Sequence, residues 1–92
     1  MARHALPAGW RKQRGHLVAG YRFKDFAQAM TFLHEVAFAS EAQGHHPDFS
    51  VHGNEVRFEV WSHDAEGITD RDHTLVATIA KIAQRHGAAR RR

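Results

Sequence analysis

Alternating apolar residues on both sides of the dipeptide Gly53-Asn54 constrain the fold of this chain more than any other feature of its sequence. Phe49 and Val51 alternate before the dipeptide, and every second residue after it is again apolar, namely Val56, Phe58 and Val60. Alternation with a period of two places apolar side chains on one face of a strand, and a Gly-Asn junction is typical of a tight hairpin turn. The sequence therefore predicts two antiparallel strands around this turn.

A second hairpin is predicted at the start of the chain. Residues 9–14 and 16–23 have the pattern of two short strands around Gly15, and the second strand presents alternate apolar residues, namely Leu17, Ala19, Tyr21 and Phe23. The two hairpins supply four strands, which can merge into one antiparallel sheet.

A helix is predicted between the hairpins, over residues 25–43. Asp25 offers an N-cap, and the apolar stripe that follows has i, i+3, i+4 spacing: Phe26, Ala29, Met30, Leu33, Val36 and Ala37. Gly44 can end this helix, and Pro47 prevents it from resuming.

A second helix is predicted after the second hairpin. Thr69 and Asp72 form a carboxylate variant of the capping box, Gly87 ends the helix, and its apolar stripe consists of Leu75, Val76, Ile79, Ile82 and Ala83. The expected fold class is therefore α+β, in two layers with the order β-β-α-β-β-α: a four-stranded antiparallel sheet with both helices packed on one face.

The length of 92 residues fits one domain. We expect a short N-terminal segment over residues 1–8, the domain over residues 9–87 and a basic tail over residues 88–92. A domain of this size buries a limited share of its surface, so association of copies is an expected further source of stability.

The charge distribution narrows the classes of function. The net charge of +3 is concentrated at the ends, in four basic residues before residue 15 and in the run Arg90–Arg92, so the body between them is acidic. A nucleic-acid reader usually gathers Lys and Arg on one folded face, so nucleic acid is not an expected partner. No stretch of ~18 apolar residues predicts a membrane span, and the polar start lacks the apolar region of a secretory signal, so we expect a cytoplasmic protein.

Nine histidines are the unusual feature of the composition. Imidazole titrates near neutral pH, so both acid–base chemistry and metal binding are within reach of such a chain. The densest group of reactive side chains lies at the exit of the first predicted helix, in the segment Glu41-Ala-Gln-Gly44-His45-His46-Pro47-Asp48. Glu41 lies at the margin of the apolar stripe, from which it can lean toward the residues that follow the helix.

His63 lies in a second loop, which links the strand that ends near Trp61 to the second helix. If the loops 41–48 and 61–64 share one edge of the sheet, three imidazoles and a carboxylate converge there. Asp72 can add a carboxylate from the first helical turn, although capping is its simpler role. The plain alternative is that both loops are solvated surface without chemistry.

Other chemistries lack their sequence patterns. Adjacent His45 and His46 diverge and no HExxH or Cys/His motif is present, so a metal site is not expected. There is no Gly-rich phosphate loop and no Gly-x-Ser-x-Gly elbow. The remaining histidines are interpreted as surface or packing residues: His4, His16, His34, His52, His73 and His86.

Five short motifs occur in a fixed order between residues 23 and 72, within a resemblance that covers roughly residues 9–86, nearly all of the chain: Phe23-Lys24-Asp25-Phe26, Glu41-x3-His45-His46-Pro47, Asn54-x-Val56, Ser62-His63 and Gly67-Ile68-Thr69-x2-Asp72. Together they resemble the pterin-4a-carbinolamine dehydratase family. The fold of that family is β-β-α-β-β-α with an extra helix in front, which this chain lacks or reduces to a few residues. Ser62 stands where threonine is common in the family, and Glu66 stands where glycine is frequent.

The resemblance implies an enzyme, a 4a-hydroxytetrahydrobiopterin dehydratase (a hydro-lyase). It would convert 4a-hydroxytetrahydropterin to quinonoid dihydropterin and water, recycling tetrahydrobiopterin after an aromatic amino acid hydroxylase, without metal, nucleotide or flavin. By carry-over, His45 and His63 are the acid–base pair, His46 holds the pterin and Glu41 orients a neighbouring histidine. The implied pterin-lining residues are Gly44, His45, His46, Trp61, Ser62, His63 and Asp64, with Pro47 and Asp72 as supports.

A non-catalytic protein-binding module is the alternative function. Some members of the family act as dimerisation cofactors of a homeodomain transcription factor, and some relatives act as assembly factors; the intact histidine set favours the enzyme. The resemblance also implies a homodimer or homotetramer, because family members pair sheets edge to edge and some pack helices into a four-helix bundle. Phe32 and Phe38 lie outside the predicted buried stripe of the first helix, where a helix of another copy could cover them. The alternative is that Phe32 widens the core-facing stripe and Phe38 covers a loop.

Overall fold

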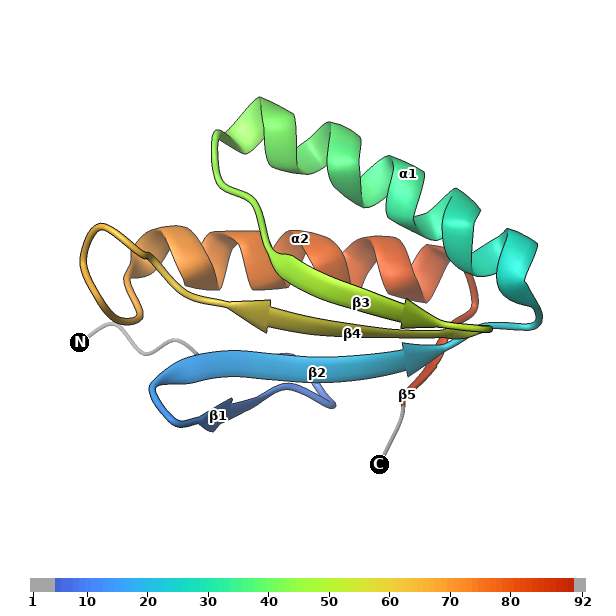
Figure 1. Ribbon diagram of the computed structural model, residues 1–92, viewed down its shortest axis with the longest axis horizontal. Helices are drawn as coiled ribbons and strands as arrows, with labels where there is room; N and C mark the ends of the chain where they lie inside the picture. The colour runs from blue at the N-terminus through green and yellow to red at the C-terminus, as the bar shows by residue number, and fades with distance from the viewer. Residues whose placement is uncertain (1–4, 91–92) are drawn as a thin grey trace.

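One antiparallel sheet covered by two helices makes up residues 5–90, the part of the chain that the computed structural model describes. The elements in chain order are β1 (Arg11–Gln13), β2 (His16–Arg22), α1 (Phe26–Gln43), β3 (Asp48–His52), β4 (Glu55–Val60), α2 (Asp70–Arg85) and β5 (Ala89–Arg90). The strand order is β1-β2-β4-β3, and both helices lie over the same face of the sheet (Figure 1). The predicted two-layer α+β fold is confirmed, while His4, Arg91 and Arg92 lie outside the described residues.

The strand β5 is an addition to the predicted four-stranded sheet. Its two residues lie in the segment that the sequence predicts as a basic tail. They pair antiparallel with Tyr21 and Arg22, on the side of β2 whose beginning pairs with β1.

The register between β2 and β4 explains where the core forms. Leu17 lies opposite Val60, Ala19 opposite Phe58 and Tyr21 opposite Val56, so all six side chains point to the helical layer. All six are buried, and α2 covers them with the predicted stripe of Leu75, Val76, Ile79, Ile82 and Ala83. The alternation in β2 and β4 is thus the buried face of the sheet, whereas Phe49 of the edge strand β3 is 55% exposed.

The buried face of α1 differs from the predicted stripe. Phe32 is fully buried, at 0% exposure, and its ring packs against Tyr21, Phe23 and Phe58. Phe26 and Met30, expected in the stripe, are 57% and 42% exposed, whereas Phe38 is 79% exposed as expected. Ala37, also expected in the stripe, is exposed. The prediction for Phe32, Phe26, Met30 and Ala37 was wrong because apolar residues surround α1 on nearly all sides, so their spacing does not single out one face.

Neither helix in residues 5–90 has the length and apolar character needed to cross a membrane. The opening segment is anchored to the core by Trp10, which is buried and donates a hydrogen bond of 2.7 Å from Nε1 to the Tyr21 hydroxyl.

Candidate active site

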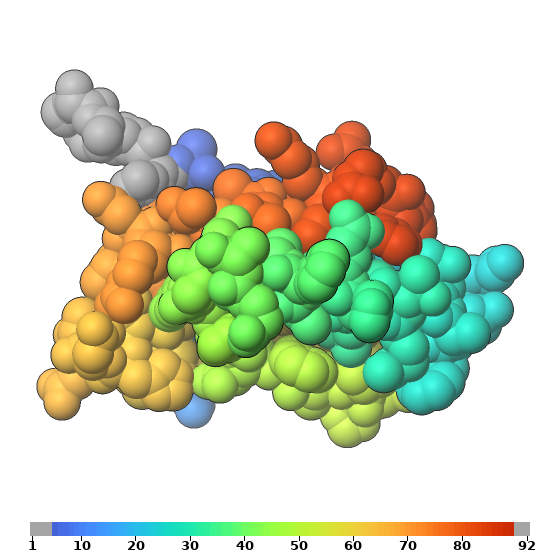
Figure 2. Space-filling view, turned by 90° about the horizontal axis from the view of Figure 1, so that it is seen from above, coloured from blue at the N-terminus to red at the C-terminus, as the bar shows by residue number. Residues whose placement is uncertain are grey.

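Two loops that carry the predicted histidines meet at one end of the sheet. Asp48 begins β3 and lies opposite Glu59 of β4, so the segment just before β3 and the segment just after β4 emerge at the same edge. Seen from the helical side, the end of α1 and the loop 61–69 lie beside each other on the surface (Figure 2). The antiparallel hairpin therefore creates the shared edge that the sequence suggested.

The end of α1 fixes the direction in which His45 leaves the helix. Gly44 has a left-handed backbone with φ 67°, and its N–H donates to the Glu41 carbonyl at 3.2 Å. The N–H of His45 also returns to the helix, donating to the Ser40 carbonyl at 3.2 Å. Glycine adopts this conformation with little strain, so the sequence stops the helix one residue before the histidine pair.

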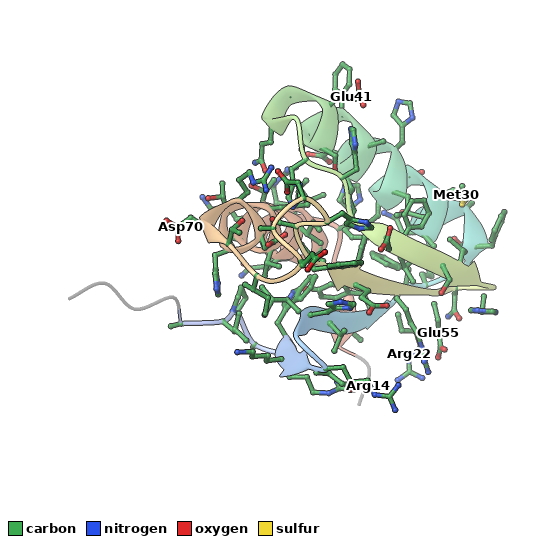
Figure 3. The ribbon with its side chains drawn as sticks, turned by 60° about the vertical axis from the view of Figure 1, so that its left-hand side comes forward. Arg14, Arg22, Met30, Glu41, Glu55 and Asp70 are labelled. Carbon is green, nitrogen blue, oxygen red and sulfur yellow. The ribbon has the colours of Figure 1, made fainter. Side chains whose placement is uncertain are left out.

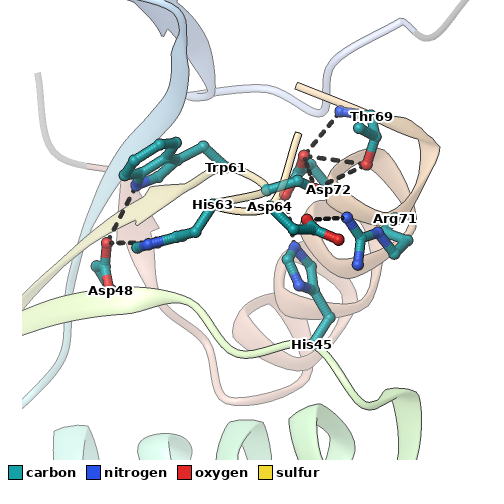
Figure 4. Close-up of polar contacts among 9 residues, drawn as sticks. His45, Asp48, Trp61, His63, Asp64, Thr69, Arg71 and Asp72 are labelled. Atoms are coloured by element: carbon teal, nitrogen blue, oxygen red, sulfur yellow. Dashed lines mark hydrogen bonds and ion pairs between the residues drawn. The ribbon is translucent and has the colours of Figure 1, made fainter. Parts of the chain in front are cut away.

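His45 is held by the buried carboxylate of Asp72. Its Nε2 lies 2.6 Å from Oδ1 of Asp72, and the two side chains are 11% and 0% exposed. The other oxygen, Oδ2, accepts hydrogen bonds of 2.8 Å from the Thr69 N–H and from the Ser62 hydroxyl (Figure 4). The capping box predicted for Thr69 and Asp72 is present, and the same carboxylate also reaches across to His45.

These contacts determine the charge state of Asp72 and the tautomer of His45. Burial alone would raise the pKa of Asp72, but hydrogen bonds from His45, the Thr69 N–H and Ser62 outweigh it and hold the pKa of the carboxyl below its ordinary value. An ionised carboxylate can only accept, so Nε2 of His45 carries a proton. In the neutral ring, Nδ1 is then the nitrogen with the lone pair.

His46 has a different carboxylate partner in a more exposed position. Its Nε2 lies 2.7 Å from Oε2 of Glu41, and both side chains are largely exposed. Glu41 projects from the outer side of α1, away from the sheet (Figure 3). The sequence expects Glu41 to orient a neighbouring histidine, and in the structure its partner is His46.

His63 lies in the loop that follows β4, next to Trp61. Its ring stacks on the indole with a centroid distance of 3.9 Å and an interplanar angle of 24°. Its Nε2 is 3.6 Å from Oδ2 of Asp48, which also accepts a hydrogen bond of 3.3 Å from the Trp61 Nε1 (Figure 4).

The opposite face of Trp61 is covered by His16, at a centroid distance of 4.2 Å and an angle of 16°. Sequence reasoning missed this contact, although a signal existed. Leu17 lies opposite Val60, so the preceding residue on β2 comes beside the residue that follows β4. His16 also forms an ion pair with Glu59.

The remaining predicted residues frame the two loops. Ser62 is fully buried: its hydroxyl bonds to Asp72 and to the Thr69 hydroxyl, and its main-chain N–H and carbonyl bond within the loop. It therefore supports the site and does not line a ligand surface, contrary to the expectation from the resemblance. Pro47 is half-buried between His46 and β3. Asp64 is exposed and pairs with Arg71 at 2.6 Å, and this hydrogen bond holds the pKa of Asp64 below its ordinary value.

Each predicted histidine therefore has its own carboxylate: His45 with Asp72, His46 with Glu41, and His63 with Asp48. Such pairs can orient imidazoles for proton transfer. A hollow of about 400 Å³ on the outer face of the sheet is lined in part by Asp48 and Glu59, the partners of His63 and His16. Within residues 5–90, no three His, Cys, Asp or Glu side chains are grouped so as to hold a metal ion.

The sequence matches a known family over most of its length. The model of the family described as pterin 4 alpha carbinolamine dehydratase matches residues 1–82. The chain belongs to the pterin-4a-carbinolamine dehydratase family. A relative from Acidobacterium capsulatum, provisionally named pterin-4-alpha-carbinolamine dehydratase, is 43% identical over 78 residues, or 85% of this chain and 84% of the relative. One from Thermomicrobium roseum with the same provisional name is 41% identical over 75 residues, or 82% and 81% of the two chains.

Solved structures of the dehydratase family share the fold. A transcriptional coactivator/pterin dehydratase from Brucella melitensis superposes with a TM-score of 0.79 at 28% identity, covering 83% of each chain. A pterin dehydratase-like protein identified as a RuBisCO assembly factor in the alpha-carboxysome superposes with a TM-score of 0.68 at 20% identity, covering 88% of this chain and 94% of that one. The second likeness concerns the fold alone.

Proposed function

We propose that this chain is a 4a-hydroxytetrahydropterin dehydratase, which forms quinonoid dihydropterin and water in the recycling of a tetrahydropterin cofactor. The observation that carries the proposal is the buried pair of His45 and Asp72 at the sheet edge that also bears His63. Membership of the dehydratase family supports the same reaction. The substrate would come from an aromatic amino acid hydroxylase, and we place the reaction in the cytoplasm.

The reaction needs one proton donor and one proton acceptor. The C4a–O bond breaks as the hydroxyl is protonated and leaves as water, while N5 loses its proton and forms a double bond to C4a. No proton is consumed overall, so two imidazoles suffice. The tautomer that Asp72 imposes leaves the lone pair of His45 on Nδ1, which suits the base, and His63 then serves as the acid.

Substrate binding is assigned to the segments that flank these two groups. His46, braced by Glu41, holds the pterin, and the chain at Gly44–His46 and on either side of Ser62 lines the ring. Ser62, Pro47 and Asp72 support these segments from behind. Trp61 can present only the edge of its ring to the pterin, because imidazoles cover both faces of the indole.

Direct turnover of the 4a-carbinolamine by purified protein tests the proposal. Replacing His45 or His63 by alanine should lower kcat/KM by ~10²-fold or more in each case, the usual scale for a positioned acid or base. His34→Ala is the matched control, because it removes an exposed imidazole from α1. Turnover at the wild-type level in both His45→Ala and His63→Ala would refute the assignment.

A non-catalytic binding module is the second candidate. The structure favours it in one respect: Phe26, Met30 and Phe38, spaced along one ridge of α1, are all exposed. A pure binding protein would show no turnover and would keep its partner after loss of His45 and His63. Measured dehydration that depends on these two residues decides for the enzyme.

A further inference from the structure

Three aromatic rings form a continuous column on the outer face of the sheet. The indole of Trp61 lies between the imidazoles of His16 and His63, with centroid distances of 4.2 Å and 3.9 Å. The rings come from the start of β2 and from the segment that follows β4. The column thus connects a strand outside the two histidine loops to the proposed catalytic His63.

Carboxylates hold both ends of this column. Glu59 pairs with His16, and Asp48 contacts both His63 and the Nε1 of Trp61. Glu59 and Asp48 lie directly opposite each other in the β3–β4 ladder, an arrangement that is unfavourable for two like charges. Each carboxylate contacts a different imidazole, so the two facing carboxylates are tied to the two ends of the column.

The contact between His63 and Asp48 does not by itself fix the His63 ring. At 3.6 Å it is longer than a hydrogen bond, so it attracts the imidazole without setting its plane. The plane is set by the indole underneath, and the indole is held in turn by His16 on its other face. Without His16, one face of Trp61 is open and the indole can tilt.

We propose that His16 is a positioning residue that acts on His63 through Trp61. The role in catalysis rests on the proposed dehydratase function, but the physical coupling between the rings does not. The side chain of His16 stacks on Trp61 and pairs with Glu59, so its effect reaches His63 through the indole and through the carboxylates beside it. Phenylalanine at this position can stack on the indole in the same way but cannot pair with Glu59.

Proton NMR and steady-state kinetics on the same variants test this coupling. The ring C–H protons of His63 lie over the indole, so the ring current of the indole should shift their resonances in the wild-type protein. His16→Ala should move them toward the positions of an unstacked histidine and lower kcat roughly tenfold, with KM within about twofold, because a tilted acid affects the transition state more than binding. His16→Phe keeps the stack but loses the pair with Glu59, so it should recover most of both effects, and His34→Ala should change neither. Glu59→Gln weakens the hold on His16 and leaves all three rings in place, so it should shift the His63 resonances in the same direction as His16→Ala. This variant provides the test if His16→Ala does not fold.

The outcomes separate this proposal from the proposed function. Unchanged His63 resonances in both His16→Ala and Glu59→Gln would overturn the coupling, whether or not the enzyme turns over. Displaced resonances with unchanged kcat would overturn the positioning role, and so would a defect in His16→Ala that His16→Phe does not repair. Wild-type protein without dehydratase activity would refute the proposed function, while the resonances alone would still decide whether His16 holds His63.

Discussion

Replacement of Asp72 by asparagine should damage stability and catalysis together. The carboxylate accepts three hydrogen bonds of 2.6–2.8 Å, from His45, the Thr69 N–H and Ser62. A hydrogen bond to a charged acceptor stabilises the folded state by about 1 kcal/mol more than a hydrogen bond to a neutral acceptor. Loss of the charge from all three bonds therefore costs about 3 kcal/mol. Burial of a neutral amide costs less free energy than burial of a carboxylate, and this difference offsets part of that loss. The expected net loss of stability is about 2 kcal/mol.

The catalytic effect follows from the geometry of the asparagine amide. Its oxygen must face the donors Thr69 N–H and Ser62, so its NH₂ group faces Nε2 of His45. The proton of the neutral imidazole then moves to Nδ1, and the lone pair assigned to the base is lost. We expect kcat/KM to fall ~10²-fold, as for removal of the base.

Urea unfolding followed by circular dichroism measures the stability effect. With a slope of about 1 kcal/mol per M for a small domain, the midpoint should fall by about 2 M near neutral pH. Because the pKa of Asp72 is lowered in the folded state, its contribution is fully present above the ordinary carboxyl pKa of about 3.9 and is lost as the pH falls through the folded value. The difference between wild type and Asp72→Asn should therefore close in acid.

The control is Glu66→Gln, which neutralises an exposed carboxylate in the loop before α2 and should change stability by no more than about 0.5 kcal/mol. An Asp72→Asn midpoint equal to that of wild type, or a difference that persists in acid, would show that the buried carboxylate is not stabilised as argued.

Two other changes test the helix that leads to the site. Gly44→Ala introduces a Cβ that meets no atom within 4 Å, so only the left-handed backbone at φ 67° opposes the substitution. We expect the free energy of unfolding, measured by heat or urea, to fall by about 1 kcal/mol. A much larger loss would indicate a close contact that this geometry does not show. Phe38→Glu places a charge on the exposed ridge of α1. If the predicted homo-oligomer forms through this ridge, the substitution should reduce its mass in analytical ultracentrifugation. An oligomer of unchanged mass would move the interface to the sheet edge, and a strictly monomeric wild type would refute the oligomer.

The strands were predictable because one side of the sheet is buried and the other is not. Because of that asymmetry, every second residue of β4 is apolar, namely Val56, Phe58 and Val60. The turn at Gly53-Asn54 fixes the register between β3 and β4. The face of α1 was not predictable, because Phe26 and Phe32 are equally apolar and the position of the sheet beneath the helix decides which is buried. The strand β5 has two residues, too few for any periodicity to be visible.

Part of the candidate site follows from the same pattern. Once a hairpin joins β3 and β4, the loops before and after them must share an edge, which brings His45 and His63 to one end of the sheet. The individual partners depend on longer-range packing. Asp72 has a sufficient local role as a capping residue, so nothing in the sequence indicates that its second oxygen reaches His45 across the layers.

The small strand β5 has a consequence for how copies of this chain can polymerise. Together with β1 it occupies the outer side of β2, and the free edge beyond them consists of short segments, with Arg11 and Lys12 on β1. Short, charged edges resist the addition of another strand. At the other end of the sheet, β3 offers a five-residue edge. Any joining of sheets then uses β3 from both copies, and a symmetric joint of this kind consumes the long edge of each, so growth terminates at the pair instead of continuing into a fibre.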